Sequence, residues 1–168
     1  MKNLTGGIIL LMVPTVVFSG PAPGKRFQDV LEIPPRDNME IVEWKEGIYQ
    51  DCITANDQGE IRNFDVNFCK YEMSESGTAE NALHQYSRKT LEGRKILKQG
   101  ETQKFGGQAC EGGWYLLHDE KTNGGVMYSW HKLVHKQHIY LVFSRFNAGA
   151  SQEIRGSISA WMKQWKVK

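Results

Sequence analysis

Four histidines lie close together in the second half of the chain, and clustered imidazoles are the usual mark of a zinc site: His118, His131, His135 and His138. Zinc holds its ligand nitrogens at about 2.0 to 2.1 Å. On an extended strand His131 and His135 share a face but lie about 13 Å apart, too far for one ion. His135 and His138 flank a predicted turn and can meet, but no third ligand is evident. We therefore keep these two as weak metal candidates only, and we predict no cofactor.

A serine, histidine and aspartate arrangement can also be drawn, from Ser129, His131 and Asp119. Ser129 and His131 share a strand face, about 6.6 Å apart along the backbone. However, Ser129 lies inside a regular strand pattern, without the sharp turn and the backbone donors that a nucleophilic serine needs. Cys110 with a histidine is no stronger, because such a thiol is more often paired or buried. The residues therefore favour a protein that is not an enzyme, and a hydrolase or metal protein built on the histidines stays as an alternative.

Glycine pairs occur at three places, and none of them matches a phosphate-binding loop: Gly106 and Gly107, Gly112 and Gly113, Gly124 and Gly125. The spacing G-x-x-x-x-G-K-S/T and the helix that follows it are both missing. We predict turns and bulges at these pairs.

Aromatic residues are concentrated in the same region as the histidines. Some of them must face the core, and those that do not would form a surface of the composition that dominates protein interfaces. Ordinary core packing is the alternative for each of them. We predict a protein-binding surface made of Trp114, Tyr128, Trp130, His131 and Tyr140.

These residues need a scaffold, and hydrophobic periodicity predicts one. Phe64, Val66 and Phe68 alternate with polar residues, which is typical of a half-buried strand. Thr78 is a plausible N-cap for a helix that Gly93 ends, and Ser151 can cap a last helix. In order, we predict strands at 39–45, 48–54 and 63–68, a helix at 79–92, a strand at 94–105, a three-strand meander at 114–119, 126–135 and 138–146, and a helix from 151 to about 165. Helices on one face of a mostly antiparallel sheet make an α+β domain.

One disulfide is possible among the three cysteines, Cys52, Cys69 and Cys110, if the compartment is oxidising. A simple hairpin with its turn at 57–60 disfavours Cys52 with Cys69. In that register Asn56 faces Ile61, and the offset between the two thiols is about 13 Å. A bulge or another register would reopen this pair, pairs with Cys110 are equally open, and three buried reduced thiols are a further alternative.

The N-terminus has the pattern of a secretory signal peptide. Lys2 precedes an uncharged apolar run at 6–18, which is too short to cross a bilayer of about 30 Å as a helix. We predict a signal at 1–19 with cleavage near Ser19, a flexible leader at 20–38 rich in proline and glycine, and one α+β domain at 39–168. A retained anchor is the alternative, and the uncleaved signal would be the only membrane contact. The formal net charge of +2 does not favour nucleic acid as a partner.

The predicted order of elements resembles the PsbP-like superfamily, which includes bacterial envelope proteins of the DcrB type. The likeness lies in Gly106-Gly107-Gln108-Ala109 before the strand Trp114-Tyr115-Leu116-Leu117, then the strand Ile139-Tyr140-Leu141-Val142-Phe143 and a last helix near Trp165. The resemblance implies a protein that binds other proteins in the periplasm or outside the cell. Specifically, it implies an inhibitor or immunity protein against a secreted toxin or enzyme. An envelope accessory protein that binds a lipid or small ligand is the alternative.

Overall fold

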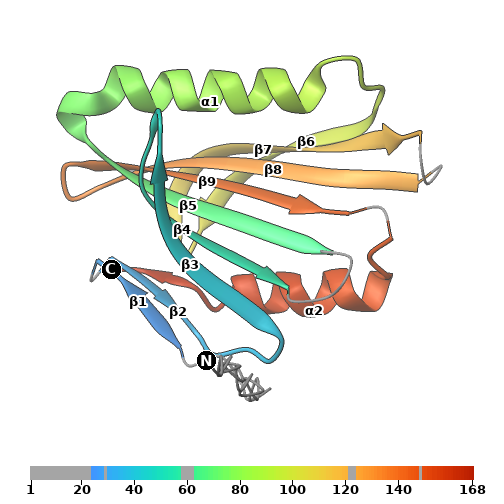
Figure 1. Cartoon of the computed structure of the whole chain (residues 1–168), viewed down its shortest axis with the longest axis horizontal. Coiled ribbons are helices and arrows are strands. Elements are labelled where there is room, and N and C mark those ends of the chain that lie inside the picture. Colours follow the sequence, from blue (N-terminus) through green and yellow to red (C-terminus); the bar gives the residue numbers. More distant parts are fainter. Residues whose placement is uncertain (1–23, 29, 58–62, 121–123, 148) are drawn as a thin grey trace, which may run out of the picture.

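The computed structural model describes residues 24–28, 30–57, 63–120, 124–147 and 149–168. A large antiparallel sheet forms the centre, in the order β3-β4-β5-β9-β8-β7-β6, and β1, β2 and β10 form a small second sheet (Figure 1). The elements are β1 (Lys25–Phe27), β2 (Leu31–Ile33), β3 (Met39–Glu46), β4 (Tyr49–Asp57), β5 (Phe64–Glu72), the 3-10 turn η1 (Met73–Glu75), α1 (Ser76–Leu91), β6 (Ile96–Phe105), β7 (Gln108–Asp119), β8 (Gly124–His135), β9 (His138–Phe146), α2 (Gln152–Met162) and β10 (Lys166–Val167). The α+β class is confirmed. In the described residues no helix is long and apolar enough to span a bilayer, and the predicted signal at 1–19 lies outside them.

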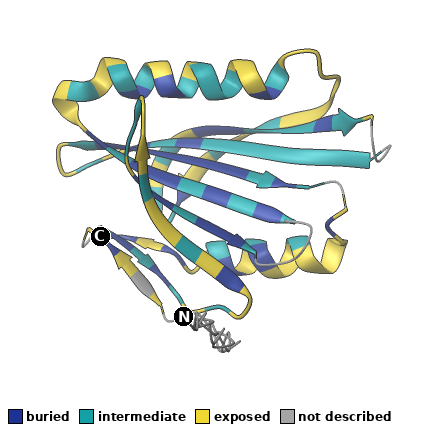
Figure 2. Cartoon of the chain, viewed as in Figure 1, coloured by how far each residue is buried: buried dark blue, intermediate teal, exposed yellow. Residues whose placement is uncertain are grey.

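The two helices pack on opposite faces of the large sheet, not on one face as expected (Figure 1). Alternation along β5 shows why. Phe64, Val66 and Phe68 point into the core between the sheet and α2, whereas Cys69 and Tyr71 point into a second core between the sheet and α1. Strand β5 is therefore apolar on both faces of the sheet, and each face must be covered by a helix. Both helices are buried toward the sheet and exposed on their outer sides (Figure 2).

Helix α1 begins three residues earlier than its pattern predicts. Thr78 lies within the helix, so the expected cap is wrong; η1 leads directly into α1, and the Glu75 carboxylate accepts from the Glu72 backbone N–H at 3.0 Å. At the other end Gly93 adopts a positive φ of 67°, which confirms it as the stop residue.

Helix α2 begins where the sequence predicts. Ser151 accepts a hydrogen bond from the Ile154 backbone N–H at 3.2 Å, and Glu153 lies in the first turn. The helix ends at Met162, earlier than expected. Trp161 and Trp165 are both buried, with ring centroids 5.0 Å apart, so the apolar stripe continues past the helix end.

A test of this cap is the substitution Ser151→Ala. We expect it to lower the free energy of unfolding by about 1 kcal/mol, because the Ile154 N–H loses its acceptor. Urea unfolding followed by circular dichroism measures the change. Thr78→Ala is the control, since Thr78 caps nothing, and a similar loss in both variants would contradict the assignment.

The segment predicted as a flexible leader belongs to the folded domain from Lys25 onward. Phe27, Leu31 and Ile33 are fully buried in the core below α2. The Trp161 indole N–H donates to the Pro34 carbonyl at 2.9 Å, which ties this segment to α2. Strand β2 also pairs with β10 at the end of the chain. The prolines and glycines of this segment led us to predict a flexible leader, but Phe27, Leu31 and Ile33 anchor it in the core. The domain therefore starts before residue 39.

The predicted hairpin between β4 and β5 has the wrong register. Asn56 pairs with Asp65, so Cys52 lies directly opposite Cys69 and the two form a disulfide. The physical reason is Asp57. Its carboxylate accepts from the backbone N–H groups of Asn63 and Phe64, each at 3.0 Å, which closes a longer loop than the tight turn we assumed. Cys110 is the free thiol among the described residues, and burial raises its pKa.

Candidate functional site

The histidines of β8 and β9 do not converge on one point. His131 is 6% exposed and packs against the Phe105 ring at 5.2 Å, below α2. Burial lowers its pKa to about 4, so it is a neutral ring at physiological pH. His135 and His138 lie opposite each other at the β8–β9 turn, but the His138 nitrogens contact the Lys136 carbonyl at 2.8 Å and the Glu72 carboxylate at 3.0 Å. The described residues contain no group of three or more potential ligands near one point.

The serine, histidine and aspartate residues do not assemble either. The Ser129 hydroxyl shares a hydrogen bond with the Ser144 hydroxyl at 2.6 Å, away from any imidazole contact. Asp119 lies opposite Gly124, at the start of β8, whereas His131 lies seven residues further along, about 23 Å away. This arrangement therefore gives Ser129 no histidine base held by Asp119.

The predicted aromatic surface is divided between the two faces of the sheet. Tyr128 and Trp130 lie on the α1 face, whereas Trp114, His131 and Tyr140 lie on the α2 face. His131 and Tyr140 are also buried, the latter at 1% exposure, so assigning them to a binding surface is wrong. The reason is strand alternation: neighbouring residues such as Trp130 and His131 must point to opposite sides.

The α1 face of β6, β7 and β8 carries a hollow beside Gly113. Gly113 pairs with Glu101 on β6 and with Trp130 on β8, so it stands in the middle of a patch of residues that share this face. Row by row the paired residues are Gln99, Tyr115 and Tyr128; Glu101, Gly113 and Trp130; and, on β7 and β8 alone, Glu111 and Lys132. We call this feature the glycine hollow.

The glycine hollow is a groove of about 650 Å³ with aromatic and carboxylate walls. It is lined by residues 99–103 of β6, by 110–113 and Tyr115 of β7, and by Trp130 of β8. A Cβ atom on Gly113 would lie 3.1 Å from the Trp130 indole nitrogen, so that ring packs over the glycine and covers it. The Trp130 N–H is buried and has no acceptor among the described residues. The groove therefore has an apolar wall, a backbone floor and two flanking carboxylates, Glu101 and Glu111.

Neighbouring side chains leave the hollow open because they are held elsewhere. Helix α1 makes its main sheet contacts with β5 and β9. Lys132 is drawn toward α1 by an ion pair with Glu80. Tyr128 accepts a hydrogen bond from the Arg94 guanidinium at 2.5 Å, and the guanidinium also stacks over its ring at 5.3 Å.

Strand β6 gives the hollow an open strand edge. It stands at the end of the sheet order and is exposed over most of its length. An edge strand presents backbone N–H and C=O groups that can pair with another chain. Register shifts interrupt β6 between Ile96 and Lys98 and between Thr102 and Lys104, which confines regular pairing to the window 98–102 beside the hollow.

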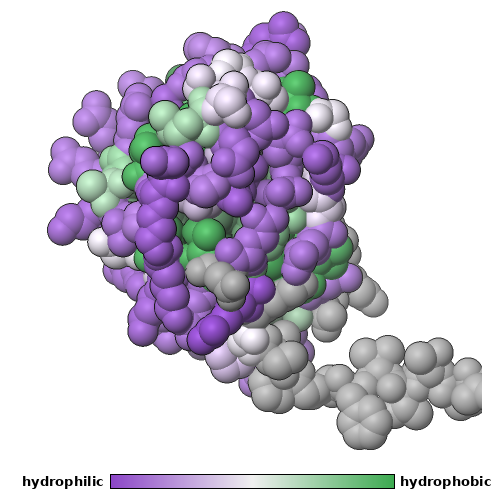
Figure 3. Space-filling view, turned by 90° about the vertical axis from the view of Figure 1, so that its left-hand side faces the viewer, coloured by the Kyte–Doolittle hydropathy of each residue, from purple (hydrophilic) through white to green (hydrophobic). Residues whose placement is uncertain are grey.

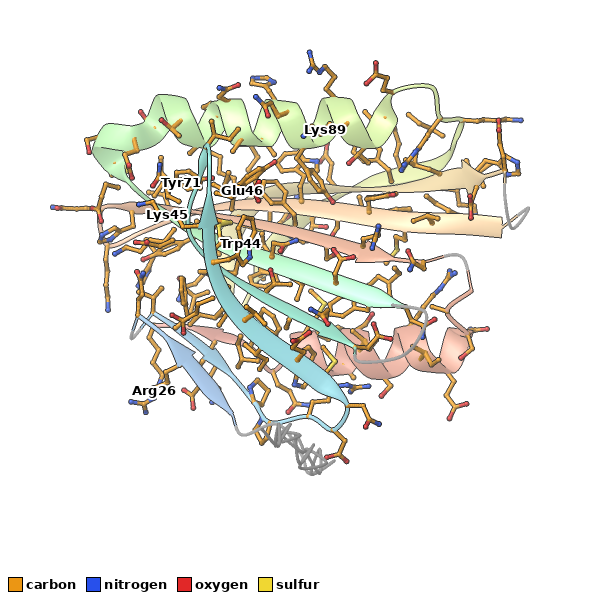
Figure 4. All side chains as sticks on the ribbon, viewed as in Figure 1. Arg26, Trp44, Lys45, Glu46, Tyr71 and Lys89 are labelled. Carbon is orange, nitrogen blue, oxygen red and sulfur yellow. A yellow bond between two sulfur atoms is a disulfide. The ribbon has the colours of Figure 1, made fainter. Side chains whose placement is uncertain are left out.

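Strand β3 forms the opposite edge of the sheet. The Trp44 indole N–H donates to the Thr54 hydroxyl at 2.5 Å, and that hydroxyl donates to the Asn67 side chain. Trp44 and Tyr71 lie where β3 rises toward α1, and Arg26 lies apart, on β1 (Figure 4). Trp44, Thr54 and Asn67 therefore link β3, β4 and β5 through their side chains.

The end of the molecule at the left of Figure 1 is covered mostly by hydrophilic side chains, with hydrophobic ones in small patches (Figure 3). Among the described residues in this view, hydrophobic side chains form no broad patch of the kind that marks a binding surface.

No model of a known protein family matches this chain, and no curated protein sequence does. Glu101, Glu111, Gly113 and Tyr115 were not predicted as site residues, and a turn or bulge was predicted at Gly112 and Gly113. In the structure both glycines are buried inside β7. A glycine within a strand pattern is itself a signal for close approach by another group, and that signal could have found the hollow.

Proposed function

We propose that this chain is an exported, non-catalytic protein-binding domain, and that it holds its partner at the glycine hollow. The observation that carries the proposal is the combination of an aromatic-walled groove with an open, regular strand edge beside it. Aromatic anchors in pockets dominate the energetics of protein interfaces, and an edge strand adds main-chain hydrogen bonds.

Export is part of the proposal. Its support is the signal-like pattern at the N-terminus together with the Cys52–Cys69 disulfide, because disulfides persist mainly in oxidising compartments. We place the protein in the periplasm or outside the cell. A PsbP-like relationship is also proposed, and its support is the order of strands and helices from Phe105 onward.

Within this class we propose an inhibitor or immunity protein against a secreted toxin or enzyme. A small, disulfide-bonded domain with a recessed site at its edge suits a binder that covers another protein's surface. The alternative of a lipid-binding envelope protein would need an apolar chamber between the sheet and a helix. The glycine hollow instead lies at the sheet edge, between carboxylates and amides, and this observation favours a protein partner.

The test is capture of a partner by the full-length gene product, expressed with a C-terminal tag and purified from the envelope or secreted fraction. The double variant Glu101→Arg and Glu111→Arg reverses both charges of the hollow. We expect it to recover about tenfold less of the partner than the wild type, a loss of about 1.4 kcal/mol. Quantitative mass spectrometry of the captured proteins measures the difference.

The matched control is Glu40→Arg with Glu46→Arg, on the opposite edge strand β3 (Figure 4 labels Glu46). It makes the same change in net charge at exposed positions, and it should capture as much partner as the wild type. Equal capture by all three proteins would refute binding at the hollow. Failure of the wild type to retain any protein specifically would refute the proposed function itself.

A further inference from the structure

The charge of the glycine hollow indicates what it receives. Its lining side chains include two carboxylates, Glu101 and Glu111, and no basic group. Within the described part of the chain no cation lies at ion-pair distance from either carboxylate, and the nearby Lys132 is paired with Glu80. The two glutamates are diagonal neighbours across β6 and β7, about 7 to 8 Å apart at the backbone. One cationic group placed between them would meet both.

The aromatic wall favours the same kind of group. Trp130, which lies over Gly113, and Tyr115 both line the groove, and ring faces attract cations, tryptophan most strongly. The next ring on this face already makes such a contact, since the Arg94 guanidinium stacks over Tyr128. A guanidinium or ammonium in the hollow would therefore combine ion pairing with ring contact.

The strand edge indicates how that group arrives. A partner strand paired with β6 would lie two strand spacings from Gly113, about 10 Å away. Lys and Arg carry their charge on a long apolar stem, and they are the side chains suited to this span. The regular window 98–102 limits the added strand to a short segment, with Glu101 near its centre.

We propose that the partner inserts an arginine or lysine, carried on an extended segment that pairs with β6, into the glycine hollow between Glu101 and Glu111. The cation stacks on the Trp130 and Tyr115 walls, and its stem passes over β6. This inference rests on the proposed function, because it names the chemistry by which a protein partner is recognised.

The test uses two synthetic peptides and the full-length gene product purified from its export compartment and labelled with nitrogen-15. The first peptide is acetyl-Thr-Val-Thr-Arg-Thr-Val-Thr-amide; the second has citrulline, the neutral analogue of arginine, at the central position. Titration by two-dimensional NMR follows the backbone amides of 98–102 and the Trp130 indole N–H. We expect the arginine peptide to shift these signals and to bind about tenfold more tightly than the citrulline peptide.

Two further measurements sharpen the result. Glu101→Gln with Glu111→Gln should remove the preference for arginine, and Glu40→Gln with Glu46→Gln should keep it. Raising the ionic strength should weaken only the arginine peptide. The comparison of the two peptides on the wild-type protein needs no variant, so a folding defect cannot obscure it.

The outcomes separate the two proposals. Equal binding of both peptides, or no shift at 98–102 and Trp130 with either of them, would overturn the inference. If the hollow variants still lose a captured partner in that case, protein binding at the hollow stands and only the cation is wrong. If the arginine peptide binds as expected but no protein is captured, the proposed function falls instead.

Discussion

The wild type is expected to lose stability between pH 6.5 and pH 4, and replacing His131 with phenylalanine is expected to abolish most of that loss. His131 is buried against Phe105, its Nδ1 has no partner among the described residues, and burial lowers its pKa from 6.5 to about 4. Below pH 6.5 the unfolded chain takes up a proton on this histidine, whereas the folded protein does not. Stability from this group is therefore complete above pH 6.5 and is lost as the pH falls toward 4, by about 3 kcal/mol.

The measurement is the free energy of unfolding in urea at pH 7.5 and at pH 4. Other groups also titrate over this range, so the result is the difference between wild type and His131→Phe in their loss of stability. His84→Phe, on the exposed side of α1, is the control and should follow the wild type. Parallel losses in the wild type and His131→Phe would show that His131 is not a buried neutral ring.

Replacing both disulfide cysteines, Cys52→Ala with Cys69→Ala, is expected to lower the free energy of unfolding by about 3 kcal/mol. The bond closes a loop between residues 17 apart in sequence, and chain entropy gives a stabilisation of this size for such a loop. Both cysteines are fully buried in the core below α1, so the loss of packing acts in the same direction.

Urea unfolding under oxidising conditions measures this loss, and a reducing agent should destabilise the wild type by a similar amount without changing the double variant. Cys110→Ala is the control, because Cys110 is not in the disulfide, and it should unfold near the wild-type midpoint. If the double variant stays within about 1 kcal/mol of the wild type, the bond does not stabilise the fold as the structure implies.

Elements with a strong local pattern were predicted closely. Alternation located β5, Ser151 located the start of α2, and Gly93 located the end of α1. Lys136 and Gln137 were expected to turn the chain, and both adopt positive φ angles there. In each case the interaction that decides the structure joins residues within four positions of one another or follows from one residue's own backbone preference.

Two errors in the fold come from contacts outside the local patterns that located these elements. The register of β4 on β5 depends on the Asp57 carboxylate and the longer loop that it closes. We assumed a tight turn instead, and the resulting register wrongly separated Cys52 from Cys69. The segment of β1 and β2 is ordered by α2 and β10, which lie at the other end of the chain. Neither contact leaves a local signal in the sequence.

The sequence by itself determined the α+β class, the positions of most strands and the apolar faces, because those follow from period and propensity. Only the tertiary structure decided the two-sided core and the disulfide. The glycine hollow likewise arises only from the sheet, because Glu101, Gly113 and Trp130 come from three strands and become neighbours through pairing register. Register is set by hydrogen bonds and loop closure across the whole sheet, and a one-residue slip would have moved Trp130 to the opposite face.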